Sequence, residues 1–97
     1  MSVTVYQFWS PTCGPCREIK PASNDLQEEF DQTSWISVNT REDPNGYTQT
    51  YGVKVVPTLA VVAKDKEGKV LTVEKQSGTN IANYYRIIRN ALKVTQQ

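Results

Sequence analysis

Histidine is absent from this chain of 97 residues, and cysteine occurs only twice. A structural zinc site usually takes four Cys and His ligands, so zinc here would need carboxylates or a second chain. Long apolar runs are also missing, because the longest purely apolar stretch, Leu59 to Ala63, is far too short to span a bilayer. We therefore expect no bound metal, no required cofactor and no membrane segment.

Charge of one sign is not in excess either, since eleven basic and ten acidic residues leave a net charge of +1. No global electric field would draw such a protein to nucleic acid or to an anionic membrane. The start, Met1 to Tyr6, has neither a basic flank nor a long apolar core, so no signal peptide is indicated. We expect a single domain over residues 1–97, a monomer, in the cytoplasm, where cysteines are kept reduced.

The two cysteines form the motif Cys13-Gly14-Pro15-Cys16, after an apolar and aromatic run and before a predicted helix. Two intervening residues let the sulfurs reach bonding distance if the first helical turn brings them together. A disulfide there closes too small a loop to stabilise a fold by itself. The motif therefore favours redox chemistry over a structural disulfide or a metal site.

A helix start would give the two sulfurs different roles. If Cys13 is the N-cap, unpaired backbone donors and the helix dipole favour its thiolate, so we expect it to be the exposed attacking thiol. Cys16, one turn into the helix, should be more buried and act as the resolving thiol. Pro15 fits the first turn, where its missing donor costs nothing, and Gly14 lets the backbone turn tightly.

Periodicity and turn residues predict four strands and three helices. A helix over residues 14–30, bent at Pro21, should follow the first strand, and a short helix should end near Tyr51-Gly52. The last helix should be capped by Thr79 or Asn80. The predicted strands cover residues 3–9, 35–39, 58–63 and 69–74, and the last helix covers residues 81–92. The order β-α-β-α-β-β-α predicts an α/β fold, a four-stranded mixed sheet with helices on both faces.

This order and several local motifs resemble the thioredoxin family from about Val3 to Leu92. No counterpart of that family's leading strand and helix precedes the first predicted strand, which brings the architecture closer to a glutaredoxin. The Gly-Pro pair between the cysteines nevertheless favours thioredoxins. The motifs that carry the resemblance are Phe8-Trp9, Cys13-Gly14-Pro15-Cys16, Pro21, Val56-Pro57-Thr58 and Gly78.

The resemblance implies a substrate-binding surface around the cysteines. It implies a cis bond between Val56 and Pro57, with the Val56 backbone free to pair with an extended substrate. Gly78 would leave a gap for the approaching substrate backbone. Trp9 should have a mixed role, its indole N–H bonded to a neighbour and one ring face beside the site.

Three residues depart from the family pattern. Gln7 stands where thioredoxins usually have a buried aspartate that takes the proton of the resolving cysteine, and Ser37 replaces the lysine partner of that aspartate. Thr12 stands where a second tryptophan commonly precedes the first cysteine, so partner choice should differ. Water or the Gln7 amide could replace the aspartate, as could Glu18 or Asp43 if the fold brings them close.

The leading hypothesis is a thiol-disulfide oxidoreductase that reduces protein disulfides through Cys13 and Cys16. Its electron donor would be a thioredoxin reductase. One alternative is a glutaredoxin-type protein recharged by glutathione. Another is a non-catalytic subunit that holds a partner on the surface formed by Trp9, Val56, Pro57 and Gly78.

Overall fold

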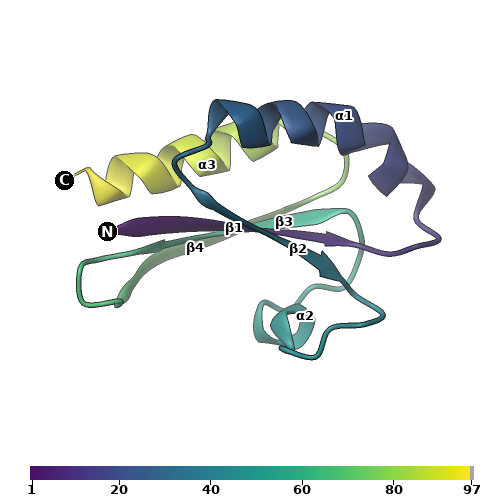
Figure 1. Cartoon of the computed structure of the whole chain (residues 1–97), viewed down its shortest axis with the longest axis horizontal. Coiled ribbons are helices and arrows are strands. Elements are labelled where there is room, and N and C mark those ends of the chain that lie inside the picture. Colours follow the sequence, from purple (N-terminus) through teal and green to yellow (C-terminus); the bar gives the residue numbers. More distant parts are fainter. Residues whose placement is uncertain (97) are drawn as a thin grey trace.

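The computed structural model describes residues 1–96 and contains one four-stranded sheet with helices on both faces (Figure 1). Helices α1 and α3 cover one face, and the short helix α2 lies on the other. The predicted element order is confirmed. The elements are β1 (Ser2–Trp9), α1 (Gly14–Glu29), β2 (Ser34–Asn39), α2 (Tyr47–Thr50), β3 (Thr58–Lys64), β4 (Val70–Ser77) and α3 (Ile81–Thr95).

The strands lie in the order β2-β1-β3-β4. Strand β1 pairs in parallel with β2, which it reaches through the α1 crossover, and antiparallel with β3. Strands β3 and β4 form the predicted antiparallel hairpin. In this register Gln7 lies opposite Ser37 on one side and Leu59 on the other, so the residue that replaces the family's aspartate lies in the centre of the sheet.

Alternation along β1 divides the apolar side chains into two cores. Val3 and Val5 face α1 and α3 in the larger core. Tyr6 and Phe8 face the opposite side, where the Tyr6 ring packs against Tyr47, with ring centroids 4.9 Å apart. Gln7 shares the face of Val5 and therefore points under α1, toward the helix that carries the cysteines.

The elements differ from the predicted ones mainly at their ends. Strand β4 runs to Ser77 rather than residue 74, because the antiparallel pairing with β3 continues to Thr58 and holds polar residues in extended form. Helix α1 continues past Pro21. Asn80 is the N-cap of α3, and its side chain accepts a hydrogen bond from the Asn83 N–H at 3.3 Å. Within residues 1–96, no helix has the length and apolar content needed to cross a membrane.

Tyr84 connects α3 to the segment that precedes it. Its side chain is only 1 % exposed, and its hydroxyl donates a hydrogen bond to the backbone carbonyl of Gly78. Burial raises the pKa of the Tyr84 phenol to about 12 from its ordinary value of 10.0. The folded state therefore favours the neutral form of this phenol.

Replacing Tyr84 by Phe should lower the free energy of unfolding by about 1 kcal/mol, because the Gly78 carbonyl loses its donor while the ring stays in place. The wild type should also lose stability as the pH rises from about 10 to about 12, since the phenol of the unfolded chain ionises first. Urea unfolding from pH 7 to pH 12 measures both effects. An alkaline loss of the same size in Tyr84→Phe would contradict this role of the phenol.

Candidate active site

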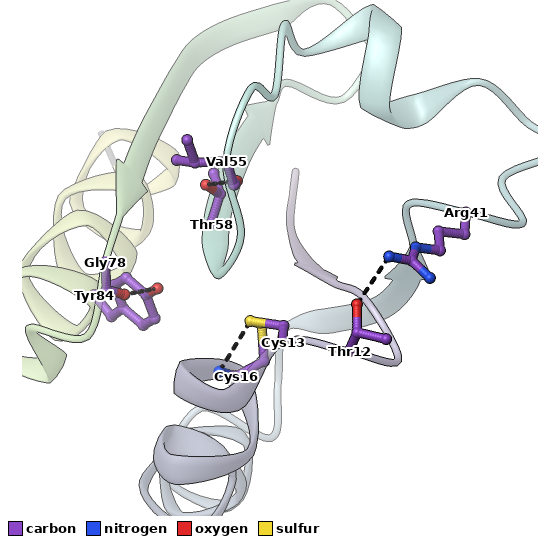
Figure 2. The surroundings of a disulfide bond; sticks show 8 residues. All are labelled: Thr12, Cys13, Cys16, Arg41, Val55, Thr58, Gly78 and Tyr84. Atoms are coloured by element: carbon purple, nitrogen blue, oxygen red, sulfur yellow. Dashed lines mark hydrogen bonds between the residues drawn. A yellow bond between two sulfur atoms is a disulfide. The ribbon is translucent and has the colours of Figure 1, made fainter.

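Cys13 and Cys16 lie where β1 ends and α1 begins, and a disulfide joins them (Figure 2). Cys13 is the N-cap of α1, with φ −88° and ψ 104°, and the Cα atoms of the two cysteines are 5.3 Å apart. The backbone N–H of Cys16 donates a hydrogen bond to the Cys13 Sγ at 3.1 Å. The sulfur of Cys13 thus takes the place that a capping oxygen takes in other helices.

The start of α1 is electrically suited to a thiolate at Cys13. Gly14 and Pro15 are its first two residues, so Pro15 lies in the first turn, where its missing N–H removes no helical hydrogen bond. The first turn contains no acidic residue, so no carboxylate opposes the positive end of the helix dipole. Negative charge on the Cys13 sulfur is therefore stabilised both by a backbone donor and by the dipole.

The exposure of the two cysteines is the reverse of the predicted one. Cys13 is buried, with 8 % of its surface exposed, whereas Cys16 is half-buried. The physical reason is the cap, because the Cys13 side chain folds back over the first turn to receive the Cys16 N–H. The loop between Val55 and Thr58 also faces it (Figure 2). The expected difference between the two sulfurs is therefore supported by position at the helix start and not by exposure.

The loop that faces the disulfide contains the cis peptide bond between Val56 and Pro57, as the family resemblance implied. Hydrogen bonds hold the loop from both ends. The Thr58 hydroxyl donates to the Val55 carbonyl at 2.7 Å, and the Gly78 N–H donates to the Pro57 carbonyl at 2.9 Å. Val56 is half-buried beside the site and Pro57 is buried.

Gly78 owes its identity to its backbone conformation. Its φ of +98° lies in the region that side chains disfavour, although a Cβ there would meet no atom within 4 Å. The interpretation of this glycine as a gap for substrate is therefore not needed to explain its presence. Its contact with substrate stays a prediction.

Trp9 and Thr12 flank the cysteines on the surface. The Trp9 indole N–H donates to the Ser37 hydroxyl at 2.7 Å, which confirms the expected bond to a neighbour, and 36 % of the residue is exposed. The Thr12 hydroxyl accepts a hydrogen bond from the Arg41 guanidinium at 2.8 Å. Sequence analysis did not identify Arg41, because this residue lies 29 positions from Thr12 and belongs to no motif.

A cavity of about 340 Å³ lies beside Cys16, between β1 and α1. Gln7 points into this space, and its amide donates a hydrogen bond to the Ser23 hydroxyl. Ser23 was not predicted, since a serine seven residues after a cysteine in a helix carries no recognisable signal. The polar residues that line the cavity include Gln7, Arg17, Lys20, Ser23, Asn24 and Ser37.

No carboxylate lines this cavity in the described part of the chain. Glu18 and Asp43, the two acids considered as proton acceptors for Cys16, both lie outside it. Asp43 instead accepts the Thr48 N–H at 2.7 Å, and hydrogen bonds from Thr48 lower the pKa of the Asp43 carboxyl. Among residues 1–96, no group of three or more Cys, His, Asp or Glu side chains could hold a metal ion.

A family model described as thioredoxin matches residues 1–86. The chain belongs to the thioredoxin family. Thioredoxin 1 of Synechococcus elongatus is 36% identical over 77 residues, which cover 78% of this chain and 70% of that relative. An M-type chloroplastic thioredoxin of Zea mays is 33% identical over 82 residues, covering 81% of this chain, which spans only 48% of that relative's length.

Solved structures agree with this assignment. The X-ray structure of Fasciola hepatica thioredoxin has a TM-score of 0.76 and is 26% identical, and the match covers 93% of this chain and 81% of that one. The disulfide between Cys13 and Cys16 is the feature expected of a thioredoxin in its oxidised state. The family assignment and this cysteine pair together support dithiol–disulfide exchange.

The lining of the cavity leads to a prediction about how Cys16 loses its proton. Because no carboxylate lines it, the resolving step should show no carboxylate titration near neutral pH. Gln7→Asp should introduce an acid whose pKa is raised by burial, and resolution should then become faster where that acid is ionised. The rate of release from a preformed mixed disulfide on Cys13, measured from pH 5 to pH 9, tests both statements.

Gln7→Asn is the matched control, since it has the size of aspartate without the charge. Its pH profile should keep the shape of the wild-type profile. A carboxylate titration in the wild type, together with an unchanged profile in Gln7→Asp, would show that another acid already acts as the base.

Proposed function

We propose that this protein reduces disulfide bonds of other proteins, with Cys13 as the attacking thiol and Cys16 as the resolving thiol. The observation that carries this proposal is the position of the Cys13 sulfur at the start of α1, where it accepts the Cys16 N–H at 3.1 Å. The same donor would stabilise the Cys13 thiolate in the reduced protein.

The reaction has two exchange steps. In the first, the Cys13 thiolate attacks one sulfur of the substrate disulfide, forming a mixed disulfide and releasing the other substrate sulfur as a thiolate. In the second, Cys16 loses its proton and attacks the Cys13 sulfur, which forms the intramolecular disulfide and releases the second substrate thiolate. The substrate gains two electrons from the dithiol, and two protons convert its thiolates to thiols.

Proton removal from Cys16 depends on the cavity beside it. Its volume of about 340 Å³ is large enough for water, and its lining is partly polar. Gln7 and Ser23 are positioning residues in this scheme, because they orient water next to the Cys16 thiol and carry no charge themselves. Water, or the leaving substrate thiolate reached through water, then takes the proton.

The substrate would lie across the loop at Val56 and Pro57. An extended substrate segment can pair with the backbone of this loop, which the hydrogen bonds at Thr58 and Gly78 hold in place. Val55, with 56 % of its surface exposed, and Trp9 supply apolar contact beside it. In this proposal Gly78 and Thr12 border the bound segment.

The electron donor we propose is a reductase of the kind that serves thioredoxins, in a compartment that keeps thiols reduced. The Gly-Pro pair and the family assignment support this donor over glutathione. Cytoplasmic location remains the expectation from the sequence, while the relatives include proteins named as chloroplastic. A binding subunit without turnover would not need the sulfur of Cys13 at a helix start.

Cys16→Ser should trap substrates as mixed disulfides on Cys13, because the resolving thiol is gone while the attacking thiol remains. Cys13→Ser should trap none. Non-reducing gel electrophoresis with a disulfide-containing protein such as insulin, followed by mass spectrometry of the adduct, measures the difference. An adduct on Cys16 in the Cys13→Ser variant would assign the roles the other way round.

Replacing both cysteines by serine separates an oxidoreductase from a binding subunit. The double variant should fold, since the disulfide closes a loop of only four residues, and should lose all insulin reduction. Reduction by the wild type should be assayed with thioredoxin reductase and, separately, with glutathione as the electron supply. Faster turnover with glutathione would favour the glutaredoxin-type alternative.

A further inference from the structure

A cation is bound to Thr12, the residue that precedes Cys13 and stands where the thioredoxin family commonly has a tryptophan. Arg41, in the turn after β2, donates from its Nη2 to the Thr12 hydroxyl at 2.8 Å (Figure 2). Its backbone N–H donates to the Asn39 side-chain oxygen at 3.0 Å. Arg41 is therefore held both at its backbone and at its guanidinium, next to the residue that precedes the attacking cysteine.

Most of the hydrogen-bonding capacity of this guanidinium is free. It has five N–H donors, and within residues 1–96 its one side-chain partner is Thr12. Arg41 is exposed, and no carboxylate of the described residues forms an ion pair with it. The Asp43 carboxylate, two residues along, is engaged by the Thr48 N–H. Arg41 can thus accept an anion from outside the chain.

Two further cations lie near the disulfide. Arg17 and Lys20 line the cavity on the side of Cys16, whereas Glu18, between them in the sequence, does not. The first turn of α1 adds no acid and contributes the positive end of its dipole.

We propose that Arg41, positioned by Thr12, determines substrate specificity by binding a carboxylate of the substrate, so that disulfides in acidic protein segments are preferred. This inference rests on the proposed function. The guanidinium fork matches a carboxylate in two parallel hydrogen bonds. Figure 2 shows Arg41 and the Val55–Thr58 loop on different sides of Cys13, so a segment bound along the loop can present a flanking Asp or Glu to Arg41.

The test uses two disulfide-linked peptides of identical sequence, one with Asp and Glu beside its cysteines and the other with Asn and Gln. Reduced wild-type protein is mixed with an excess of each peptide, and the second-order rate constant of a single turnover is measured, so no reductase is needed. The acidic peptide should react about threefold to tenfold faster at low ionic strength. The preference should shrink at high salt.

Variants assign the preference to Arg41. Arg41→Gln should equalise the two rate constants. Arg41→Lys should retain part of the preference, because lysine keeps the positive charge but cannot form two parallel hydrogen bonds with a carboxylate. Thr12→Val should weaken the preference, because the guanidinium loses its hydrogen bond to Thr12. Lys66→Gln, which removes a cation from the turn between β3 and β4, is the matched control and should leave the ratio unchanged. Thermal unfolding of each variant checks that it is folded.

The outcomes are distinguishable from those of the proposed function. Reduction of neither peptide would refute the proposed function itself. Equal rate constants in the wild type, or a preference that survives in Arg41→Gln, would overturn the role of Arg41. Glutathione disulfide, whose carboxylates are the other source of this chemistry, is measured in parallel. A dependence on Arg41 that is seen only with glutathione disulfide would overturn the assignment to acidic protein segments.

Discussion

The chemistry of this protein depends on the N-terminus of one helix. The end of β1 delivers Cys13 to the position where α1 has unpaired N–H groups, and a sulfur takes the place of the usual capping oxygen. The helix cap and the proposed nucleophile are therefore one atom. The sheet fixes where this helix starts. Strand β1 is paired on both sides, and α1 packs against the sheet face from which the Val5 side chain projects.

Much of the fold could be predicted because its signals are local. The period of apolar residues, the Cys-Gly-Pro-Cys motif and the turn residues gave the element order, and a proline in the first turn marked the start of α1. The family resemblance added the cis bond at Pro57, because no local pattern distinguishes a cis proline there from an ordinary trans proline before a strand. The end of β4 was misplaced because residues 75–77 are held extended by the partner strand rather than by their own propensities.

Contacts between distant segments were beyond sequence reasoning. The Arg41 bond to Thr12 joins two loops that follow different strands, and the bond between Gln7 and Ser23 joins a strand to a helix. The burial of Cys13 was predicted wrongly for a related reason, since the direction of a capping side chain is set by the helix it caps. At the position of the family's aspartate this chain has a neutral amide, and no carboxylate lines the cavity beside Cys16 in the described part of the chain.

Tyr84, Gly78 and Pro57 form a continuous line of hydrogen bonds. The Tyr84 hydroxyl holds the Gly78 carbonyl, and the Gly78 N–H holds the Pro57 carbonyl, so the last helix is connected to the loop opposite the cysteines. The buried Tyr84 and the loop opposite the cysteines are therefore held by the same chain of hydrogen bonds. If this loop binds substrate as proposed, amino-acid changes in α3 affect substrate recognition as well as folding, and a change in the loop can be compensated by a change in α3.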